Sequence, residues 1–175
     1  METVVRMGEA SASGAHGDVL ACIGLGSCIG LALVDRDGGV AALAHVMLPE
    51  AASSARAVEQ PHKFADLAVP ALVELAVAHG AVRPRLEAVL VGGAAMFKLG
   101  GSGQDIGARN AVAVQEQLVT LRIPVRATAT GGDRGRTVRV QVASPPTITV
   151  REAGGREEQL LGAPLVRIPQ PEVAA

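Results

Sequence analysis

Cys28 and His45 are the side chains of this sequence with the clearest potential for covalent chemistry. A thiol with an ordinary pKa of about 8.5 is mostly protonated at neutral pH, whereas a neighbouring imidazolium stabilises the reactive thiolate. The same imidazole can carry protons to and from the reacting groups. We therefore interpret Cys28 as a candidate nucleophile and His45 as its candidate base.

The two residues lie on neighbouring strands of a predicted β-hairpin. Two apolar runs are expected to form its strands, 29–34 and 40–47. Between them lies Asp37-Gly38, a dipeptide favoured in tight hairpin connections. With this dipeptide at the centre of the turn, Gly30 pairs with His45, and Cys28 becomes the diagonal neighbour of His45, with backbones roughly 7–8 Å apart. A register change of one residue would place the two side chains on opposite faces, so the prediction depends on the register.

A glycine-containing segment, Gly24-Leu25-Gly26-Ser27, precedes the candidate nucleophile and lets the backbone approach a substrate closely. We predict that backbone N–H groups at Gly26 and Ser27 stabilise the oxyanion of a tetrahedral intermediate. The glycine spacing also invites comparison with a dinucleotide-binding loop, but the next turn follows too soon for the required helix. A P-loop is excluded because no Gly-Lys-Ser/Thr sequence occurs.

Composition narrows the classes of partner. With 175 residues, 49% of them hydrophobic, the chain can form one domain with a substantial core. A net charge of −1 offers no field that attracts a polyanion, and Phe64 and Phe97 are the only rings available for base stacking. No apolar stretch approaches the roughly 20 residues of a membrane span. We expect a soluble, cytoplasmic protein that neither binds nucleic acid nor inserts into a membrane.

The pattern of elements predicts an α+β fold: a single-domain layered α/β sandwich with mixed β-strands and two main helices. The first helix begins at Pro61 and contains Pro70, which we expect to kink or interrupt it. The second helix is capped by Asp105 and ended by Pro124. Besides the hairpin, the predicted strands are 19–23, 86–91, 125–129, 137–142 and 147–151.

The remaining segments are predicted as loops and a tail. Residues 100–103 are expected to form a mobile glycine loop, and the stretch 130–136 fits either a tight strand connection or an anion-binding turn. We assign residues 1–153 to the domain. Residues 154–175 lack sustained periodicity and are assigned to a peripheral C-terminal tail, part of which we expect to be flexible.

Six sequence blocks together resemble the CheD family, over roughly residues 4–151. In chain order they are GLGSC at 24–28, AHVMLP at 44–49, HKFAD at 62–66, VGGAAMF at 91–97, IGARN at 106–110 and TGGDRGR at 130–136. The resemblance implies that Cys28 is the nucleophile and His45 its partner. It also implies a layered α/β architecture similar to the catalytic domain of the cytotoxic necrotizing factor toxins.

The activity implied by the resemblance is that of a chemoreceptor glutamine deamidase. Such an enzyme hydrolyses glutamine side-chain amides on the cytoplasmic helices of methyl-accepting chemotaxis proteins through a Cys thioester, with no metal or organic cofactor. Two alternatives stay open. The chain could be a non-catalytic or weakly catalytic chemotaxis module that acts through the phosphatase CheC, or it could hydrolyse receptor glutamate methyl esters.

One residue departs from the family pattern. Where the family commonly has a threonine that supports the site, this chain has Cys22. A thiol is a weaker hydrogen-bonding group than a hydroxyl, so Cys22 either orients His45 less firmly or serves as a buried apolar residue. Cys22 and Cys28 are the only cysteines, which argues against a disulfide scaffold and against CxxC metal sites.

Overall fold

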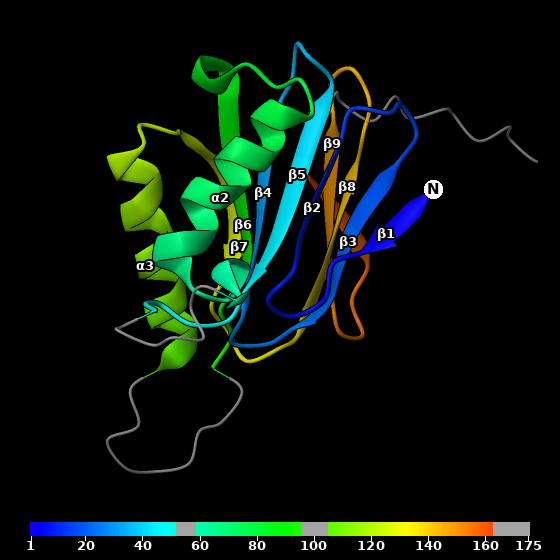
Figure 1. The fold of residues 1–175 in the computed structure, drawn as a ribbon. Coiled ribbons are helices and arrows are strands. Elements are labelled where there is room, and N and C mark those ends of the chain that lie inside the picture. Colours follow the sequence, from blue (N-terminus) through cyan, green and yellow to red (C-terminus); the bar gives the residue numbers. More distant parts are fainter. Residues whose placement is uncertain (52–58, 96–104, 163–175) are drawn as a thin grey trace, which may run out of the picture.

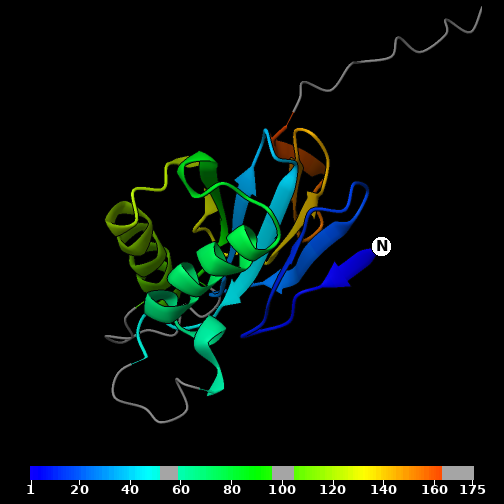
Figure 2. The same cartoon turned by 45° about the horizontal axis from the view of Figure 1, so that its top comes forward.

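The computed structural model describes residues 1–51, 59–95 and 105–162. These residues form three layers, in which two helices cover one face of a five-stranded sheet and a second five-stranded sheet covers its other face. The layers are separated in Figure 1, and Figure 2 shows α2 and α3 side by side on the same sheet face. The predicted α+β layered fold is therefore confirmed.

The central sheet carries both candidate catalytic residues. Its strand order is β2-β5-β4-β6-β7, with bounds Ala10–Ser13, Val40–Val46, Ile29–Asp35, Leu86–Gly92 and Val125–Thr130. β4 and β5 form the predicted antiparallel hairpin, while β6 and β7 pair in parallel. The β4–β5–β6 core of this sheet is buried almost without interruption, as expected for strands covered on both faces.

The outer sheet has the order β1-β3-β8-β9-β10. Its strands span Glu2–Val4, Val19–Leu25, Arg136–Gln141, Thr147–Glu152 and Glu157–Leu161. β3, β8 and β9 lie close to the predicted strands. β1 and β2 were not predicted from the sequence, and neither was β10, which pairs with β9 and lies in the segment assigned to the tail.

The helices are η1 (Pro61–Lys63), α2 (Ala65–Ala78), η2 (Arg83–Arg85) and α3 (Ile106–Thr120). The expected interruption at Pro70 was wrong, because α2 runs through this residue. Pro70 is the sixth of the 14 residues of α2, and although its missing N–H removes one helical hydrogen bond, the helix continues to Ala78. Asp105 caps α3 as predicted, by accepting a hydrogen bond from the Ala108 N–H at 3.2 Å.

Side chains alternate between two apolar cores along the hairpin. Leu31 and Leu33 pack toward the helices, whereas Ala32 and Val34 pack toward the outer sheet. The predicted glycine loop at 100–103 lies outside the described residues. Within the described ranges, no helix is long and apolar enough to cross a membrane.

Candidate active site

The hairpin register places the two candidate catalytic residues as the sequence predicted. Gly30 pairs with His45 and Ile29 pairs with Val46. Cys28 directly precedes β4, two positions before Gly30, so Cys28 and His45 are diagonal neighbours. The prediction that Cys28 lies at the start of a strand and diagonal to His45 is confirmed.

Both side chains face the outer sheet. Ala41 and Leu43 of β5 pack into the core between the two sheets, and the alternation along the strand directs His45 to the same face. Cys28 is half-buried and packs against the same core. The thiol and the imidazole therefore share one face of the central sheet.

Gly30, which is the strand partner of His45 and follows Cys28 by two positions, lets the outer sheet pack closely on this part of the hairpin. A Cβ atom at Gly30 would lie 2.8 Å from Leu25 Cδ1, 3.0 Å from Val138 Cγ1 and 3.7 Å from Cys22 Cβ. The outer sheet thus packs directly on the backbone of residue 30, and a larger residue would push the sheets apart. This close packing also brings Cys22, which is fully buried, to the edge of the site.

His45 is held by the N-terminal segment. Its side chain is only 4% exposed, and Nδ1 lies 3.3 Å from the carbonyl oxygen of Val5. A carbonyl oxygen can only accept, so this contact assigns the proton to Nδ1 and leaves Nε2 as the proton acceptor. The backbone of His45 is also paired, since its N–H donates to the Glu9 carbonyl and its carbonyl accepts from the Gly8 N–H. Residues 5–9 thus fix both the position and the tautomer of the ring.

Burial shifts the pKa values of both candidate catalytic groups toward their neutral forms. Burial lowers the pKa of His45, although the hydrogen bond to Val5 and the charge of Glu9 oppose the shift. Burial raises the pKa of Cys28. The pKa of Cys22 is also raised, first by burial and then by the neighbouring Cys28. Burial therefore disfavours the charged forms of both groups, whereas the sequence suggested that an imidazolium would stabilise the thiolate.

The backbone before β4 is fixed by three consecutive carbonyl groups. The Gly26 carbonyl accepts from the Ala94 N–H at 2.8 Å, and the Cys28 carbonyl accepts from the Gly93 N–H at 2.8 Å. Between them, the Ser27 carbonyl accepts from the side chain of Asn110 at 2.9 Å. Residues 26–28 therefore have a defined backbone orientation at the position where the sequence predicted oxyanion donors.

The turn after β6 can reach Cys28 only because it contains glycine. Gly92 has a φ of 113° and Gly93 a φ of 65°, both in the region that favours glycine. A Cβ atom at Gly92 would overlap the Cys28 carbonyl oxygen, and one at Gly107 would overlap the backbone of this turn. The glycines of the VGGAAMF and IGARN blocks thus allow three chain segments to meet next to Cys28.

Asn110 is the site residue whose role the sequence did not predict. It lies on α3, is fully buried, and its Nδ2 donates to the carbonyls of both Ser27 and Met47 at 2.9 Å. One amide group thereby connects the residue before Cys28 with the strand end that follows His45. A signal existed in the sequence, because Asn110 lies one helical turn before Val114 on the apolar stripe of α3.

Two further sequence blocks stabilise the surroundings of the site. In the HKFAD block, the Lys63 carbonyl accepts from the N–H groups of Met47 and Leu48, which fixes the chain after β5. The stretch 130–136 connects β7 to β8, and Arg136 donates to the Gly131 carbonyl and to the Glu152 carboxylate. The Arg136 guanidinium is therefore paired within the protein.

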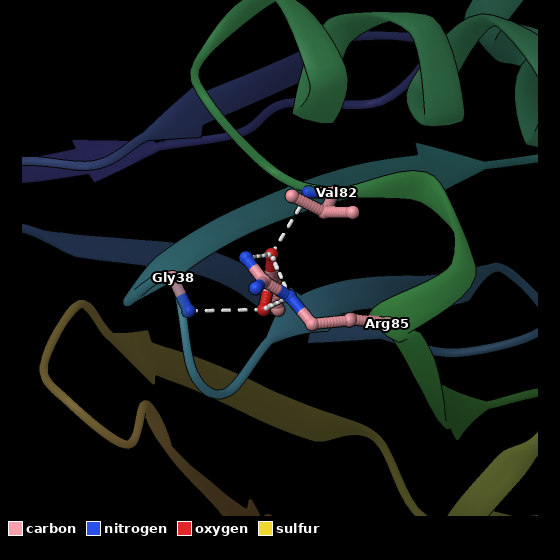
Figure 3. Close-up of polar contacts among 4 residues, drawn as sticks. Gly38, Val82 and Arg85 are labelled. Atoms are coloured by element: carbon pink, nitrogen blue, oxygen red, sulfur yellow. Dashed lines mark hydrogen bonds and ion pairs between the residues drawn. The ribbon is translucent and has the colours of Figure 1, made fainter.

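The opposite end of the hairpin carries a different polar cluster. Asp35 is fully buried and accepts hydrogen bonds from the N–H groups of Gly38 and Val82 and from the Arg85 guanidinium, at 2.7–3.1 Å (Figure 3). Burial alone would raise the pKa of Asp35, but these hydrogen bonds outweigh it and hold the pKa below its usual value. A hollow of about 710 Å³ borders this cluster, far along the strands from Cys28. Among the described residues, no group of His, Cys, Asp or Glu side chains is arranged to hold a metal ion.

The fold and the site define a layered α+β protein with a thiol and an imidazole on one face of a hairpin. The chain matches the family described as CheD chemotactic sensory transduction over residues 47–151. It is 45% identical over 124 residues to the probable chemoreceptor glutamine deamidase CheD of Geobacillus kaustophilus, covering 69% of this chain and 75% of that protein. A protein of the same name from Clostridium botulinum strain Hall is 44% identical over 127 residues, covering 71% and 78% respectively. The chain belongs to the CheD family.

Proposed function

We propose that this protein is a protein-glutamine deamidase that acts on chemoreceptors, with Cys28 as nucleophile and His45 as base. The observation that carries the proposal is the placement of the thiol and the imidazole on one face across Gly30. Family membership supports the substrate, since similar CheD proteins are named probable chemoreceptor glutamine deamidases. The alternative of a purely non-catalytic module is less well supported, because it would leave this arrangement without a use.

The first half of the reaction transfers the acyl group to the enzyme. His45 Nε2 takes the proton of the Cys28 thiol as sulfur attacks the carboxamide carbon of glutamine, and the C–S bond forms while the carbonyl π electrons move to oxygen. When the intermediate collapses, the C–N bond breaks and His45 gives its proton to the departing nitrogen. Ammonia and a thioester are the products of this half. Backbone N–H groups at Gly26 and Ser27 are the proposed donors to the oxyanion.

The second half restores the enzyme. His45 Nε2 removes a proton from water, whose oxygen attacks the thioester carbon, and collapse of the second intermediate breaks the C–S bond. The proton on His45 returns to the Cys28 sulfur, which leaves a glutamate side chain on the receptor. Overall, one glutamine and one water give one glutamate and one ammonia. A receptor glutamate methyl ester would be cleaved by the same steps with methanol as the leaving group.

The neutral resting state fits this mechanism. Burial raises the pKa of Cys28 and lowers that of His45, and in the proposed mechanism the proton moves from sulfur to Nε2 during the attack. The hydrogen bond between Nδ1 and the Val5 carbonyl keeps Nε2 free to act as the proton acceptor. Binding to the phosphatase CheC stays a prediction from the family resemblance.

Mass spectrometry of a co-expressed chemoreceptor cytoplasmic fragment tests the proposal. We expect specific glutamines to gain the mass that replacing NH₂ by OH produces, and we expect Cys28→Ala to abolish the change. A receptor that keeps all its glutamines with the wild-type protein would contradict the deamidase proposal. A parallel receptor carrying glutamate methyl esters would show whether those are hydrolysed as well.

A further inference from the structure

We infer that Asn110 is a positioning residue that turns the Cys28 N–H toward the reacting carbonyl oxygen, so that the nucleophile's own amide is an oxyanion donor. This inference rests on the proposed acyl transfer at Cys28 and deepens it. Its physical basis is the orientation of one peptide group, the one that joins Ser27 to Cys28.

The orientation of that peptide follows from the contacts of its carbonyl. The Ser27 carbonyl oxygen accepts from Asn110 Nδ2 at 2.9 Å, and α3, which carries Asn110, covers the helix-side face of the central sheet. In a trans peptide the C=O of one residue and the N–H of the next point in opposite directions. The Cys28 N–H therefore points away from Asn110, and an oxyanion bound by it would lie on that side of the Ser27–Cys28 peptide.

The Cys28 N–H is the proposed donor to the oxyanion. Within the described residues, the Cys28 N–H has no hydrogen-bond acceptor, although its own carbonyl accepts from the Gly93 N–H. An oxyanion formed by attack of the Cys28 sulfur on a carbonyl carbon would develop next to this N–H. Preorganised backbone donors of this type contribute strongly to acyl transfer because they do not reorient during the reaction.

The contacts also fix which end of the Asn110 amide faces the site. Both Ser27 and Met47 present carbonyl oxygens to Asn110, and two acceptors require the NH₂ end of the amide. The Asn110 Oδ1 is buried with no hydrogen-bond partner among the described residues. An unbonded buried oxygen carries a free-energy cost. The position of Asn110 is therefore not explained by stability alone, which supports a role in orienting the Ser27–Cys28 peptide.

The test compares two reagents that react with the same thiol. p-Nitrophenyl acetate acylates Cys28: the C–S bond forms through an oxyanion, and the C–O bond to p-nitrophenolate then breaks. Iodoacetamide alkylates the same sulfur at a saturated carbon, with loss of iodide and without an oxyanion. We expect Asn110→Ala and Asn110→Asp to lower the acylation rate on the order of 10²-fold. The alkylation rate and its pH profile should stay close to those of the wild type.

Two controls accompany these variants. Val114→Ala removes a buried side chain from the same helix without touching Ser27 or Met47, and we expect it to preserve the ratio of the two rates. Cys28→Ala gives the rates at which the two reagents react with the remaining cysteine, Cys22. Unchanged acylation in the Asn110 variants would overturn the inference, and so would an equal fall in acylation and alkylation, because that would reflect a displaced thiol.

A measurement on the wild-type protein covers the case in which the Asn110 variants do not fold. A peptide in which an aldehyde replaces the side-chain carboxamide of glutamine should form a hemithioacetal with Cys28. We expect a downfield shift of the Cys28 amide proton in the NMR spectrum of this adduct. An unshifted Cys28 amide in the adduct would overturn the inference. The deamidase proposal fails separately, if the wild-type protein reacts with both reagents but leaves receptor glutamines unchanged.

Discussion

The two ends of the β4–β5 hairpin are fixed in opposite ways. At the turn end, Asp35 is an acceptor whose two oxygens are fully used by Gly38, Val82 and Arg85 (Figure 3). At the site end, Asn110 is a donor that connects the flanking chain segments, and its own oxygen has no partner in the described ranges of the chain. Each end contains one buried polar side chain, but within the part of the chain that the structure describes only Asp35, at the turn end, has both side-chain oxygens hydrogen-bonded.

This difference indicates what each end is built for. A buried carboxylate with four donors stabilises the turn and sets the register that brings Gly30 opposite His45. The site end carries the polar groups proposed to meet a substrate, among them His45 Nε2, the half-buried thiol of Cys28 and the Cys28 N–H, which has no acceptor among the described residues. If the proposed site is correct, stability and reactivity are separated along a single hairpin, and substitutions at the two ends should have different consequences.

Among these substitutions, His45→Gln is expected to change the rate of deamidation most. Without a proton acceptor, Cys28 stays a thiol, and deamidation per folded molecule should fall by on the order of 10²- to 10⁴-fold. The measurement is the initial rate of ammonia release from a purified receptor fragment, normalised to folded protein by circular dichroism. A rate within a few-fold of the wild type would show that another group activates Cys28.

Asp35→Asn should produce the opposite pattern at the turn end. The substitution keeps the size of the side chain but turns an N–H group toward existing donors, so we expect a loss of about 2 kcal/mol in the free energy of unfolding. Urea denaturation measures this loss. The rate of deamidation per folded molecule should not change. A fall in that rate at full folding would mean that the two ends are not independent.

The two ends of the hairpin should also respond to acid in different pH ranges. Because burial lowers the pKa of His45, this ring becomes protonated at a lower pH in the folded state than in the unfolded state, where its pKa is about 6.5. Stability from the neutral ring is present above about 6.5 and decreases as the pH falls toward the folded pKa. Deamidation should also decline in this lower range, since Nε2 becomes protonated. A rate profile with its acid midpoint above 6.5 would contradict the lowered pKa of His45.

The turn end should respond only at more acidic pH. The pKa of Asp35 is held below its usual value, so its contribution is present above about 3.9 and is lost as the pH falls through the lowered pKa. The difference in unfolding free energy between the wild type and Asp35→Asn should therefore be constant from neutral pH to about 4. An earlier decrease would contradict the assigned hydrogen bonds.

Substitutions at Cys22 should have the smallest effect on the rate of deamidation. They test whether Cys22 belongs to the catalytic site. If the thiol helps to orient His45, Cys22→Thr should keep or raise the rate, because a hydroxyl is the stronger hydrogen-bonding group, and Cys22→Ala should lower it. In the structure the bonded ring nitrogen of His45 faces the Val5 carbonyl. We therefore expect both variants to keep the rate and to change the free energy of unfolding by about 1 kcal/mol. A rate that falls only in Cys22→Ala would place Cys22 in the catalytic site.

The sequence was informative where local patterns determine geometry. The Asp-Gly turn predicted the hairpin register, and with it the common face of Cys28 and His45. Alternation along β8 predicted the buried positions Val138 and Val140. These features depend on neighbours in the chain, so local patterns suffice to predict them.

Contacts between distant segments were not accessible in the same way. The acceptor for His45 is a backbone carbonyl at Val5, and carbonyl groups have no sequence signature. β1 is short and largely exposed, and β10 contains mostly polar residues, so neither strand shows an apolar alternation. Asn110 was detectable as a polar residue on an apolar stripe, but its partners Ser27 and Met47 became known only from the packing of α3.

The most direct test of this account compares Cys28→Ala and Asp35→Asn in one assay of receptor-fragment deamidation, with each rate expressed per folded molecule. We expect no deamidation with Cys28→Ala at wild-type stability, and wild-type deamidation with Asp35→Asn at reduced stability. Residual deamidation with Cys28→Ala, at a rate comparable to the wild type, would contradict the assignment of the reaction to the site end of the hairpin.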